Sequence, residues 1–367
     1  MNNFITEETR FFCGIDLHKR KSFIYVLNDE GRKVKSTEIE TLREEIINFF
    51  SCFKPAEIIV ALEVGSLTFS VCDIIRDMGI SIYVVNTLEN HYLSRSMKKT
   101  DKQDAKKLAI QLWKRILPRP IYIPCKEERD IRQLISHRHF LVKDLTRIKN
   151  RTNYLVSNYD IKLSKRSLGN NAQWSRLSEK IHNLNDKILF LEFDLLYKQY
   201  LMLQEQVAKI ENLIRTKISE ENRLNEMYEK LFTIPGMGKI SSSSLIGCIG
   251  DINRFSNVRE LVSYLGLCPR IRESGGKSIG GRSITKRGNS LLRGYLTQVA
   301  VAVLRSRRPE ALPLKLWYER LRKKKGWRTA RVALARKMAA IAFGVLKTNR
   351  SFDPGMISID HEGSLTE

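Results

Sequence analysis

The sequence predicts an α/β domain at the N-terminus, followed by long helices and a mainly helical C-terminal region. Strand-like and helix-like segments alternate over the first 85 residues. A narrow apolar stripe at coiled-coil spacing follows between residues 177 and 214. A chain of 367 residues is longer than one hydrophobic core usually supports, so we expect several compact parts.

The first three segments predict antiparallel strands. Phe11–Leu17 and Ser22–Asn28 are short β-prone runs. Asp29-Glu30-Gly31 is a turn signal after the second run, and it predicts a hairpin that leads to a third strand near Lys33–Glu38.

Helices and strands alternate after these hairpins. Leu42–Phe53 and Leu67–Met78 have helical spacing. Glu57–Glu63 is a nearly continuous apolar run typical of a central strand, and Ile80–Val85 predicts another buried strand. Three antiparallel strands followed by βαβ units are the order found in ribonuclease-H-like nuclease domains.

Two further helices are expected around a proline-rich connection. Thr100 to Gln103 fits a capping box, in which the threonine hydroxyl accepts from the Gln103 amide, so a helix should run from Thr100 to about Ile116. The prolines between residues 118 and 124 enforce an extended connection because proline lacks an amide donor. A long helix rich in Arg and Lys then runs from about Glu127 to Asn158.

The stripe in the middle of the chain predicts a coiled coil. Its flanks are charged, which favours a coiled coil between chains or within a helical hairpin, and the first case would make the protein an oligomer. The alternative is an ordinary long helix that packs on its own domain. The stripe consists of Leu177, Ile181, Leu184, Ile188, Leu191 and Leu195 and, after a slip, of Leu203, Val207, Ile210 and Ile214.

A second compact unit is expected from Leu231 onward. The segment Ile234–Ile240 reads Ile-Pro-Gly-Met-Gly-Lys-Ile and precedes a helix of small residues. Such a turn resembles the helix-hairpin-helix, whose glycines let backbone amides approach a DNA phosphate. The alternative is a tight glycine turn that only packs two helices.

Most of the chain's positive charge lies in its C-terminal third. Arg270–Arg350 contains 22 Lys or Arg against three Glu and no Asp, a net charge of +19, and the whole chain carries +24 with a pI near 9.8. This imbalance predicts contact with nucleic acid through its phosphates. The interleaved aromatic residues would stack on bases or pack in the core: Tyr295, Trp317, Tyr318 and Trp327.

The sequence disfavours a membrane partner and a zinc site. No stretch approaches about 18 uninterrupted apolar residues, and the N-terminus lacks the pattern of a signal peptide, so we expect a soluble intracellular protein without a membrane partner. The six cysteines form no C-x-x-C pair and are interpreted as reduced core residues. His137 and His139 lie two apart on an expected helix, which suits a zinc site poorly.

Four acidic residues are candidate metal ligands. Asp16 lies inside an apolar strand, where an unpaired carboxylate is costly unless a cation or donors compensate it. Glu63 ends the central strand expected beside it, and Asp101 and Asp104 project from one face of a helix start. Oxygen ligands of this kind suit Mg²⁺. The alternative is that these carboxylates simply pair with nearby lysines: Lys19, Lys98 and Lys102.

Ser274 is a further candidate, in a glycine loop rich in arginine. No histidine follows it before His361, so no Ser-His-Asp arrangement is visible and peptidase-like chemistry is disfavoured. A Ser-Gly-Gly segment is ordinarily just a turn. The surrounding cations are suited to holding a phosphate during its transfer: Arg270, Arg272, Lys277, Arg282, Lys286 and Arg287.

Several motifs stand in order at plausible spacing from about residue 11 to residue 354, although each motif alone is weak. They are Gly14–Lys19, Ala61–Glu63, Lys99–Ala105, Ile234–Gly238, Tyr264–Leu267, Glu273–Lys277, Ile284–Asn289 and Ala335–Lys337. Together these motifs resemble those of the insertion-sequence 110 family of transposases.

The resemblance implies a RuvC-like domain whose Asp-Glu-Asp-Asp set falls on Asp16, Glu63, Asp101 and Asp104 and holds Mg²⁺. It also implies a transposase domain in which Ser274 forms a covalent phosphoserine link to DNA. Members of the family act as tetramers on donor and target DNA with a structured noncoding guide RNA, the bridge RNA, and build a composite active site from two subunits. A prokaryotic cytoplasmic location, at the nucleoid during action, is implied as well.

The implied domains are a RuvC-like domain over residues 1–160, a coiled-coil domain over 161–230, a transposase domain over 231–355 and a disordered tail over 356–367. RNA-guided recombination through Ser274 is the leading hypothesis for the function. A RuvC-like junction endonuclease, in which the carboxylates activate water, is the second. A non-catalytic nucleic-acid-binding protein is the third.

Overall fold

The computed structural model describes residues 4–93, 100–163, 168–268, 273–274, 277–278, 284–286 and 288–357. The chain forms two compact units, residues 1–123 and 124–367, and each is described by itself. The functional domain limits expected at residues 160, 230 and 355 remain predictions. Apart from its first two residues, the expected C-terminal tail lies outside the described residues.

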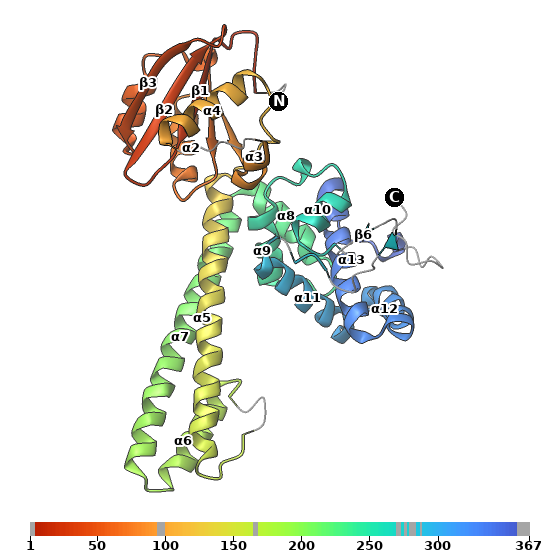
Figure 1. Ribbon diagram of the computed structural model, residues 1–367. Coiled ribbons are helices and arrows are strands. Elements are labelled where there is room, and N and C mark those ends of the chain that lie inside the picture. The colour runs from red at the N-terminus through yellow and green to blue at the C-terminus, as the bar shows by residue number, and fades with distance from the viewer. Residues whose placement is uncertain are drawn as a thin grey trace. The chain divides into compact units, whose positions relative to one another are not determined.

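A mixed five-stranded sheet is the centre of the first unit (Figure 1). Its order is β3-β2-β1-β4-β5, in which β1 pairs antiparallel with β2 and parallel with β4. All five predicted strands are confirmed, each end within two residues. They are β1 (Phe11–Asp16), β2 (Lys21–Asn28), β3 (Lys33–Glu40), β4 (Ile58–Glu63) and β5 (Ser81–Val85).

Helices cover both faces of this sheet. Ile15 and the other side chains on the same face of the sheet pack with α1 (Arg43–Phe50) and α2 (Thr68–Asp77). Ala61 and the opposite set of side chains pack against α4 (Asp101–Trp113). Burial on both faces explains why the central strands are apolar without alternation. The three predicted helices are therefore confirmed, while the short elements η1 (Pro55–Glu57) and α3 (Thr87–Leu93) were not predicted.

A long helical hairpin begins the second unit. Helix α5 (Lys126–Ser157) runs antiparallel to α7 (Lys187–Glu220), as Figure 1 shows. The ion pair between Arg138 and Glu211, 2.6 Å long, joins the two helices. The shorter α6 (Asn171–His182) closes the far end, where the fully buried Trp174 stacks on Tyr200 with ring centroids 4.4 Å apart.

The predicted apolar stripe is corrected in its middle part. Asn183–Asp186 breaks the helix, so Leu184 lies between α6 and α7. Ile188, Leu191 and Leu195 are 72, 58 and 52% exposed, whereas Leu189, Phe193, Leu196 and Tyr200 are buried. The hairpin therefore packs through a neighbouring face of α7, because the aromatic cluster around Trp174 requires it. Leu177, Ile181 and Ile214 at the ends of the stripe are buried, as an internal hairpin requires.

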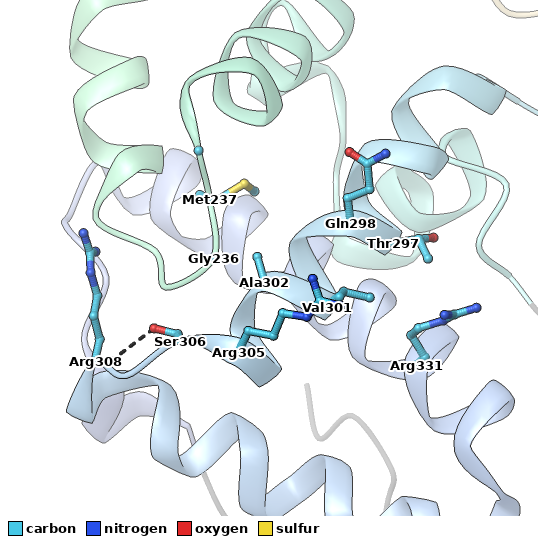
Figure 2. A pocket seen from close by; sticks show the side chains of 11 residues that line it. Gly236, Met237, Thr297, Gln298, Val301, Ala302, Arg305, Ser306, Arg308 and Arg331 are labelled. Carbon is cyan, nitrogen blue, oxygen red and sulfur yellow. Dashed lines mark hydrogen bonds between the residues drawn. The ribbon is translucent and has the colours of Figure 1, made fainter. Parts of the chain in front are cut away.

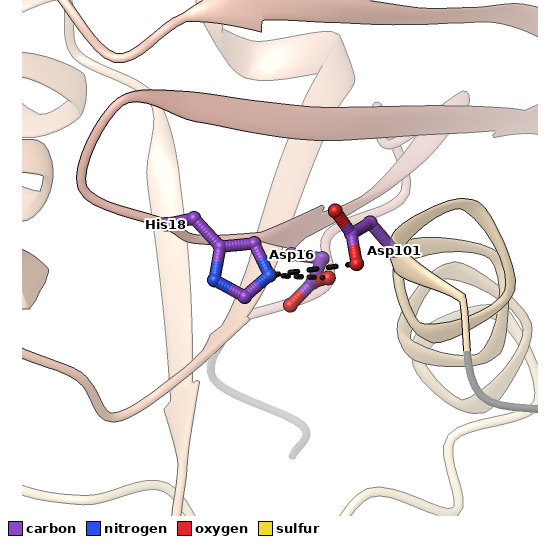
Figure 3. Close-up of side chains that lie close together, drawn as sticks. All are labelled: Asp16, His18 and Asp101. Atoms are coloured by element: carbon purple, nitrogen blue, oxygen red, sulfur yellow. Dashed lines mark hydrogen bonds and ion pairs between the residues drawn. The ribbon is translucent and has the colours of Figure 1, made fainter.

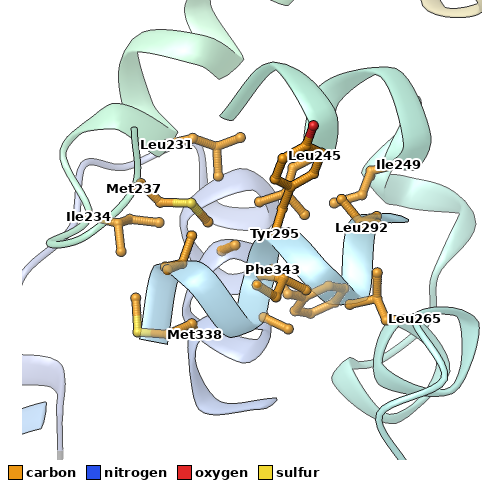
Figure 4. Packing of buried hydrophobic residues seen from close by; sticks show 14 of the residues in the cluster. Leu231, Ile234, Met237, Leu245, Ile249, Leu265, Leu292, Tyr295, Met338 and Phe343 are labelled. Atoms are coloured by element: carbon orange, nitrogen blue, oxygen red, sulfur yellow. The ribbon is translucent and has the colours of Figure 1, made fainter. Parts of the chain in front are cut away.

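Helices α8 to α13 enclose a second apolar core around Leu231, Leu245, Leu292 and Phe343 (Figure 4). The predicted glycine turn joins α8 to α9. Gly236 there has φ +80°, and a Cβ on it would lie 2.8 Å from the Val299 carbonyl oxygen, so the fold requires glycine. The elements are α8 (Asn222–Phe232), α9 (Lys239–Ile249), η2 (Ile252–Arg254), α10 (Val258–Tyr264), β6 (Glu273–Ser274), β7 (Lys277–Ser278), α11 (Ser290–Arg305), η3 (Pro309–Ala311), α12 (Leu312–Lys325), α13 (Trp327–Thr348) and η4 (Pro354–Met356).

Of the four aromatic residues that the sequence analysis named in the basic segment, three pack in the core. Tyr295 and Tyr318 are buried and Trp317 lies against the same cluster, whereas Trp327 is 51% exposed. All six cysteines are free, and three of them are buried. None of the described helices has the length and apolar character needed to cross a membrane.

Candidate active site

Asp16 and Glu63 end two neighbouring parallel strands. The register between β1 and β4 pairs Ile15 with Leu62, so the next residue in each strand is one of the two acids. Carboxyl ends of adjacent parallel strands lie at the same edge of a sheet, and both acids are partly exposed there. The strand pairing therefore brings two of the four predicted acidic residues to one edge.

Helix α4 supplies the other two acids, and Gly14 lets the helix approach. A Cβ on Gly14 would lie 2.2 Å from the Ala105 carbonyl oxygen and 2.5 Å from the Ala109 nitrogen, so only glycine allows α4 to lie this close to β1. Thr100 caps the helix, and its hydroxyl accepts from the Gln103 amide as predicted. The first turn of α4 thus presents Asp101 and Asp104.

His18 joins Asp16 and Asp101, as Figure 3 shows. The His18 Nε2 atom lies 3.2 Å from Asp16 Oδ2 and 3.6 Å from Asp101 Oδ1. The ligand atoms of these three residues all lie within 4.8 Å of one another. The sequence analysis missed His18, although its spacing of two residues from Asp16 at a strand end was the available signal.

Glu63 and Asp104 lie outside that group of ligand atoms. Glu63 Oε1 accepts a hydrogen bond of 2.8 Å from Nδ2 of the buried Asn90 in α3. Asp104 Oδ1 lies 3.6 Å from Lys107 Nζ, three residues further along α4, a pairing that the sequence analysis did not name. Asn90 was not found from the sequence, because nothing local marks an asparagine as the partner of a distant strand end.

The surroundings of the Asp16 carboxyl disfavour its ionised form. Burial is the main cause that raises the pKa of the Asp16 carboxyl above its ordinary value, and the charges of Asp101 and Asp104 raise it further. His18 acts in the opposite direction, through its charge and its hydrogen bond. Carboxylates that repel one another at one sheet edge are the arrangement that a divalent cation stabilises.

The Asp16, His18 and Asp101 side chains fit a divalent metal ion. Two carboxylate oxygens are hard ligands of the kind that Mg²⁺ and Mn²⁺ take, and the imidazole nitrogen adds a ligand that also suits Mn²⁺. The first unit therefore has a candidate metal centre at the carboxyl ends of β1 and β4.

Ser274 lies in the second unit, in a short hairpin. It belongs to β6 and pairs with Lys277 of β7. Lys286 is exposed and has φ +55°. The other predicted cations around the serine lie outside the described residues: Arg270, Arg272, Arg282 and Arg287.

Two family models match the chain. A transposase model of the IS110 type with an Asp-Glu-Asp-Asp set matches residues 13–160. The model for the transposase IS116/IS110/IS902 family matches residues 228–314. The first match contains the candidate metal centre, and the second contains the glycine turn and the Ser274 hairpin.

Curated relatives extend over most of the chain. The transposase for insertion sequence element IS1111A of Coxiella burnetii is 26% identical, over 81% of this chain and 82% of its own length. A probable family 20 transposase of Pseudomonas aeruginosa is 24% identical, over 93% of this chain and 98% of its own. The pilin gene-inverting protein of Moraxella bovis is 28% identical over 74% of each chain. With both family models matched in order, the chain belongs to the IS110 family of transposases, enzymes that recombine DNA.

Proposed function

We propose that this chain is an RNA-guided DNA recombinase in which Ser274 attacks a DNA phosphodiester with help from a metal held by the acidic centre. The observation that carries the proposal is the meeting of Asp16, His18 and Asp101 within 4.8 Å at the carboxyl ends of the central strands. Metal-dependent phosphodiester chemistry requires such a group of ligands.

The sheet supports a RuvC-like assignment of the first unit. Three antiparallel strands followed by two parallel ones, with helices on both faces, are the arrangement of ribonuclease-H-like nucleases. In the proposed centre Asp16 and Asp101 hold Mg²⁺, Glu63 and Asp104 complete the acidic set, and His18 adds a nitrogen ligand or orients Asp16. A bound divalent ion supplies positive charge that lowers the proton affinity of an attacking hydroxyl.

The proposed reaction conserves phosphodiester bonds. The Ser274 Oγ atom forms a bond to phosphorus, the bond between phosphorus and one strand oxygen breaks, and the serine proton goes to that departing oxygen. A hydroxyl end from another strand then attacks the phosphorus, the bond between phosphorus and Ser274 Oγ breaks, and the proton of that hydroxyl returns to Oγ. Lys277 and Lys286, with the neighbouring arginines, stabilise the negative charge of the transferring phosphate.

The serine and the acidic centre belong to different compact units, which fits a composite site built from two subunits of an oligomer. The exposed side chains Ile188, Leu191 and Leu195 on α7 support self-association, because apolar stripes of this kind mark protein contacts. A tetramer, and a bridge RNA that selects donor and target DNA by base pairing, complete the proposal.

Trapping of a covalent intermediate tests this proposal. Purified protein, RNA that copurifies with it, and labelled donor and target DNA should give a protein–DNA adduct that resists denaturation. Ser274→Ala should abolish the adduct while the fold and RNA binding persist. Cleavage without an adduct would instead support a junction endonuclease, which is the second candidate because the ligand group lies wholly within the first unit.

The non-catalytic alternative gives the opposite result. If the acidic centre were only structural, Asp16→Asn would leave every DNA transaction of the protein intact. Loss of DNA cleavage in a folded Asp16→Asn protein that still binds RNA excludes it.

A further inference from the structure

A cavity in the second unit lies apart from the residues of the proposed reaction. Its volume is about 690 Å³, in the range of ligand-binding sites. The glycine turn before α9, the C-terminal half of α11 with the residues after it, and α13 form its walls (Figure 2). Nothing in the reaction proposed above uses it.

Three arginines line this cavity: Arg305, Arg308 and Arg331. None of them forms an ion pair with a residue that the structure describes, whereas Arg138, Arg215 and Arg322 elsewhere in this unit each pair with a glutamate. Arg331 Nε is buried and has no hydrogen-bond partner among the described residues. No acidic side chain is among the lining residues, so the cavity presents uncompensated positive charge.

The fold requires glycine at one of the two glycine positions of the cavity but not at the other. Gly236 is required by the fold, as its positive φ shows. Gly238 has φ −112°, which any residue adopts, and a Cβ on it would meet no atom within 4 Å. The fold does not require glycine at position 238, and its missing side chain leaves the backbone open to a ligand at the cavity.

An exposed aromatic ring adjoins one of these arginines, Arg331. The Arg331 guanidinium lies 5.0 Å from the centroid of the Trp327 ring, and Trp327 is 51% exposed. A basic groove beside an exposed aromatic ring is the arrangement with which proteins bind single strands: cations hold the phosphates, and bases stack on the ring.

We propose that this cavity binds the sugar–phosphate backbone of a single-stranded nucleic acid, with a base stacked on Trp327. The inference rests on the proposed function only in taking nucleic acid as the ligand. Guanidinium groups recognise phosphodiesters of DNA and RNA alike, so the shared chemistry is the phosphodiester chain and the experiment separates the two sources.

Binding of labelled oligonucleotides to the full-length protein over a salt series tests the inference. The probes are single-stranded DNA, RNA of the same sequence, and duplex DNA. Arg305→Ala/Arg308→Ala should raise the Kd for the single strand about tenfold or more. It should also lower the slope of log Kd against log salt by about 1.5, because two phosphate contacts are lost.

The matched control is Arg307→Ala/Arg320→Ala, which removes the same charge from two exposed arginines that do not line the cavity. It should leave the Kd within about twofold of wild type. Equal weakening by the cavity and control variants would overturn the inference, as would unchanged binding by the cavity variant. A larger loss with RNA assigns the site to RNA, and a larger loss with DNA assigns it to DNA.

Two further variants separate binding from folding. Gly238→Ala keeps every charge and meets no atom, so it should melt like wild type and still weaken single-strand binding. Trp327→Ala should weaken the single strand about tenfold and leave the duplex unchanged, and an unchanged single strand would refute base stacking. Wild-type protein that binds the single strand through this cavity but forms no covalent adduct with DNA would contradict the recombinase proposal alone.

Discussion

The acidic centre and the serine hairpin differ in the secondary structure that holds their side chains. Asp16 and Glu63 end strands that are buried on both faces of the sheet, and Asp101 is held by a capped helix packed on that sheet. Ser274 belongs to a strand of two residues that pairs with another of two. Buried strands and a packed helix thus preorganise the proposed metal-binding half, whereas the described backbone at the proposed nucleophile is one pair of two-residue strands.

Loss of the central carboxylate should have the largest effect. Asp16→Asn keeps the side-chain size but removes the ionised oxygen, so DNA cleavage and strand transfer should fall about 10³-fold. Gel-based strand-transfer assays measure the loss. Asp77→Asn, at an exposed acid paired with Arg43, is the control and should keep full activity. Retained activity in Asp16→Asn would show that the acidic centre takes no part in the reaction.

Gly14→Ala tests whether preorganisation comes from the contact between β1 and α4. The new Cβ would collide with backbone atoms of Ala105 and Ala109, so α4 must move and carry Asp101 with it. We expect the free energy of unfolding to fall by about 1–3 kcal/mol and activity to fall about 10²-fold. Gly65→Ala, whose Cβ would meet no atom within 4 Å, is the matched control. Equal activity of the two variants would show that the position of α4 is not critical.

Asn90→Ala should have a smaller effect, because Asn90 positions Glu63 and is not itself a proposed ligand. Without the hydrogen bond of 2.8 Å the Glu63 carboxylate is no longer oriented, so metal affinity or activity should fall about 10- to 100-fold. Titration of Mg²⁺ or Mn²⁺ against activity measures this, and excess metal should restore part of the loss. A loss that metal does not relieve would point to a folding defect, which thermal melting would detect.

The sequence predicted the first unit well because its signals are local. Apolar runs ended by Asp16 and Glu63 define the strands, and Thr100 marks the helix start, so the elements and their acids follow from spacing. What spacing could not supply is the partner across the fold. His18 reaches Asp101, and Asn90 reaches Glu63, through contacts between elements far apart in the chain.

The apolar stripe of α7 shows a different limit. Leucine spacing selected Ile188, Leu191 and Leu195, yet the buried face contains Leu189, Phe193 and other neighbours. A helix with apolar residues on two faces allows two predictions of which face is buried. The position of Trp174 on α6 decides between them. Ser274 remains a prediction because its role depends on a substrate.

The pH dependence of stability gives the smallest effect and tests the electrostatics directly. Burial and the neighbouring acids raise the Asp16 pKa, so the fold favours the protonated carboxyl. The stabilisation from this group is complete below its ordinary pKa of 3.8 and is lost as the pH rises through the raised value. In metal-free buffer Asp16→Asn should therefore melt at a higher temperature than wild type at pH 7, and the difference should vanish near pH 4. Added Mg²⁺ should raise the Tm of the wild type alone, because only its centre binds the ion. If the difference in Tm between the two proteins instead widens as the pH falls, Asp16 is stabilised as an anion without metal. The carboxylates at this edge of the sheet would then not require a cation.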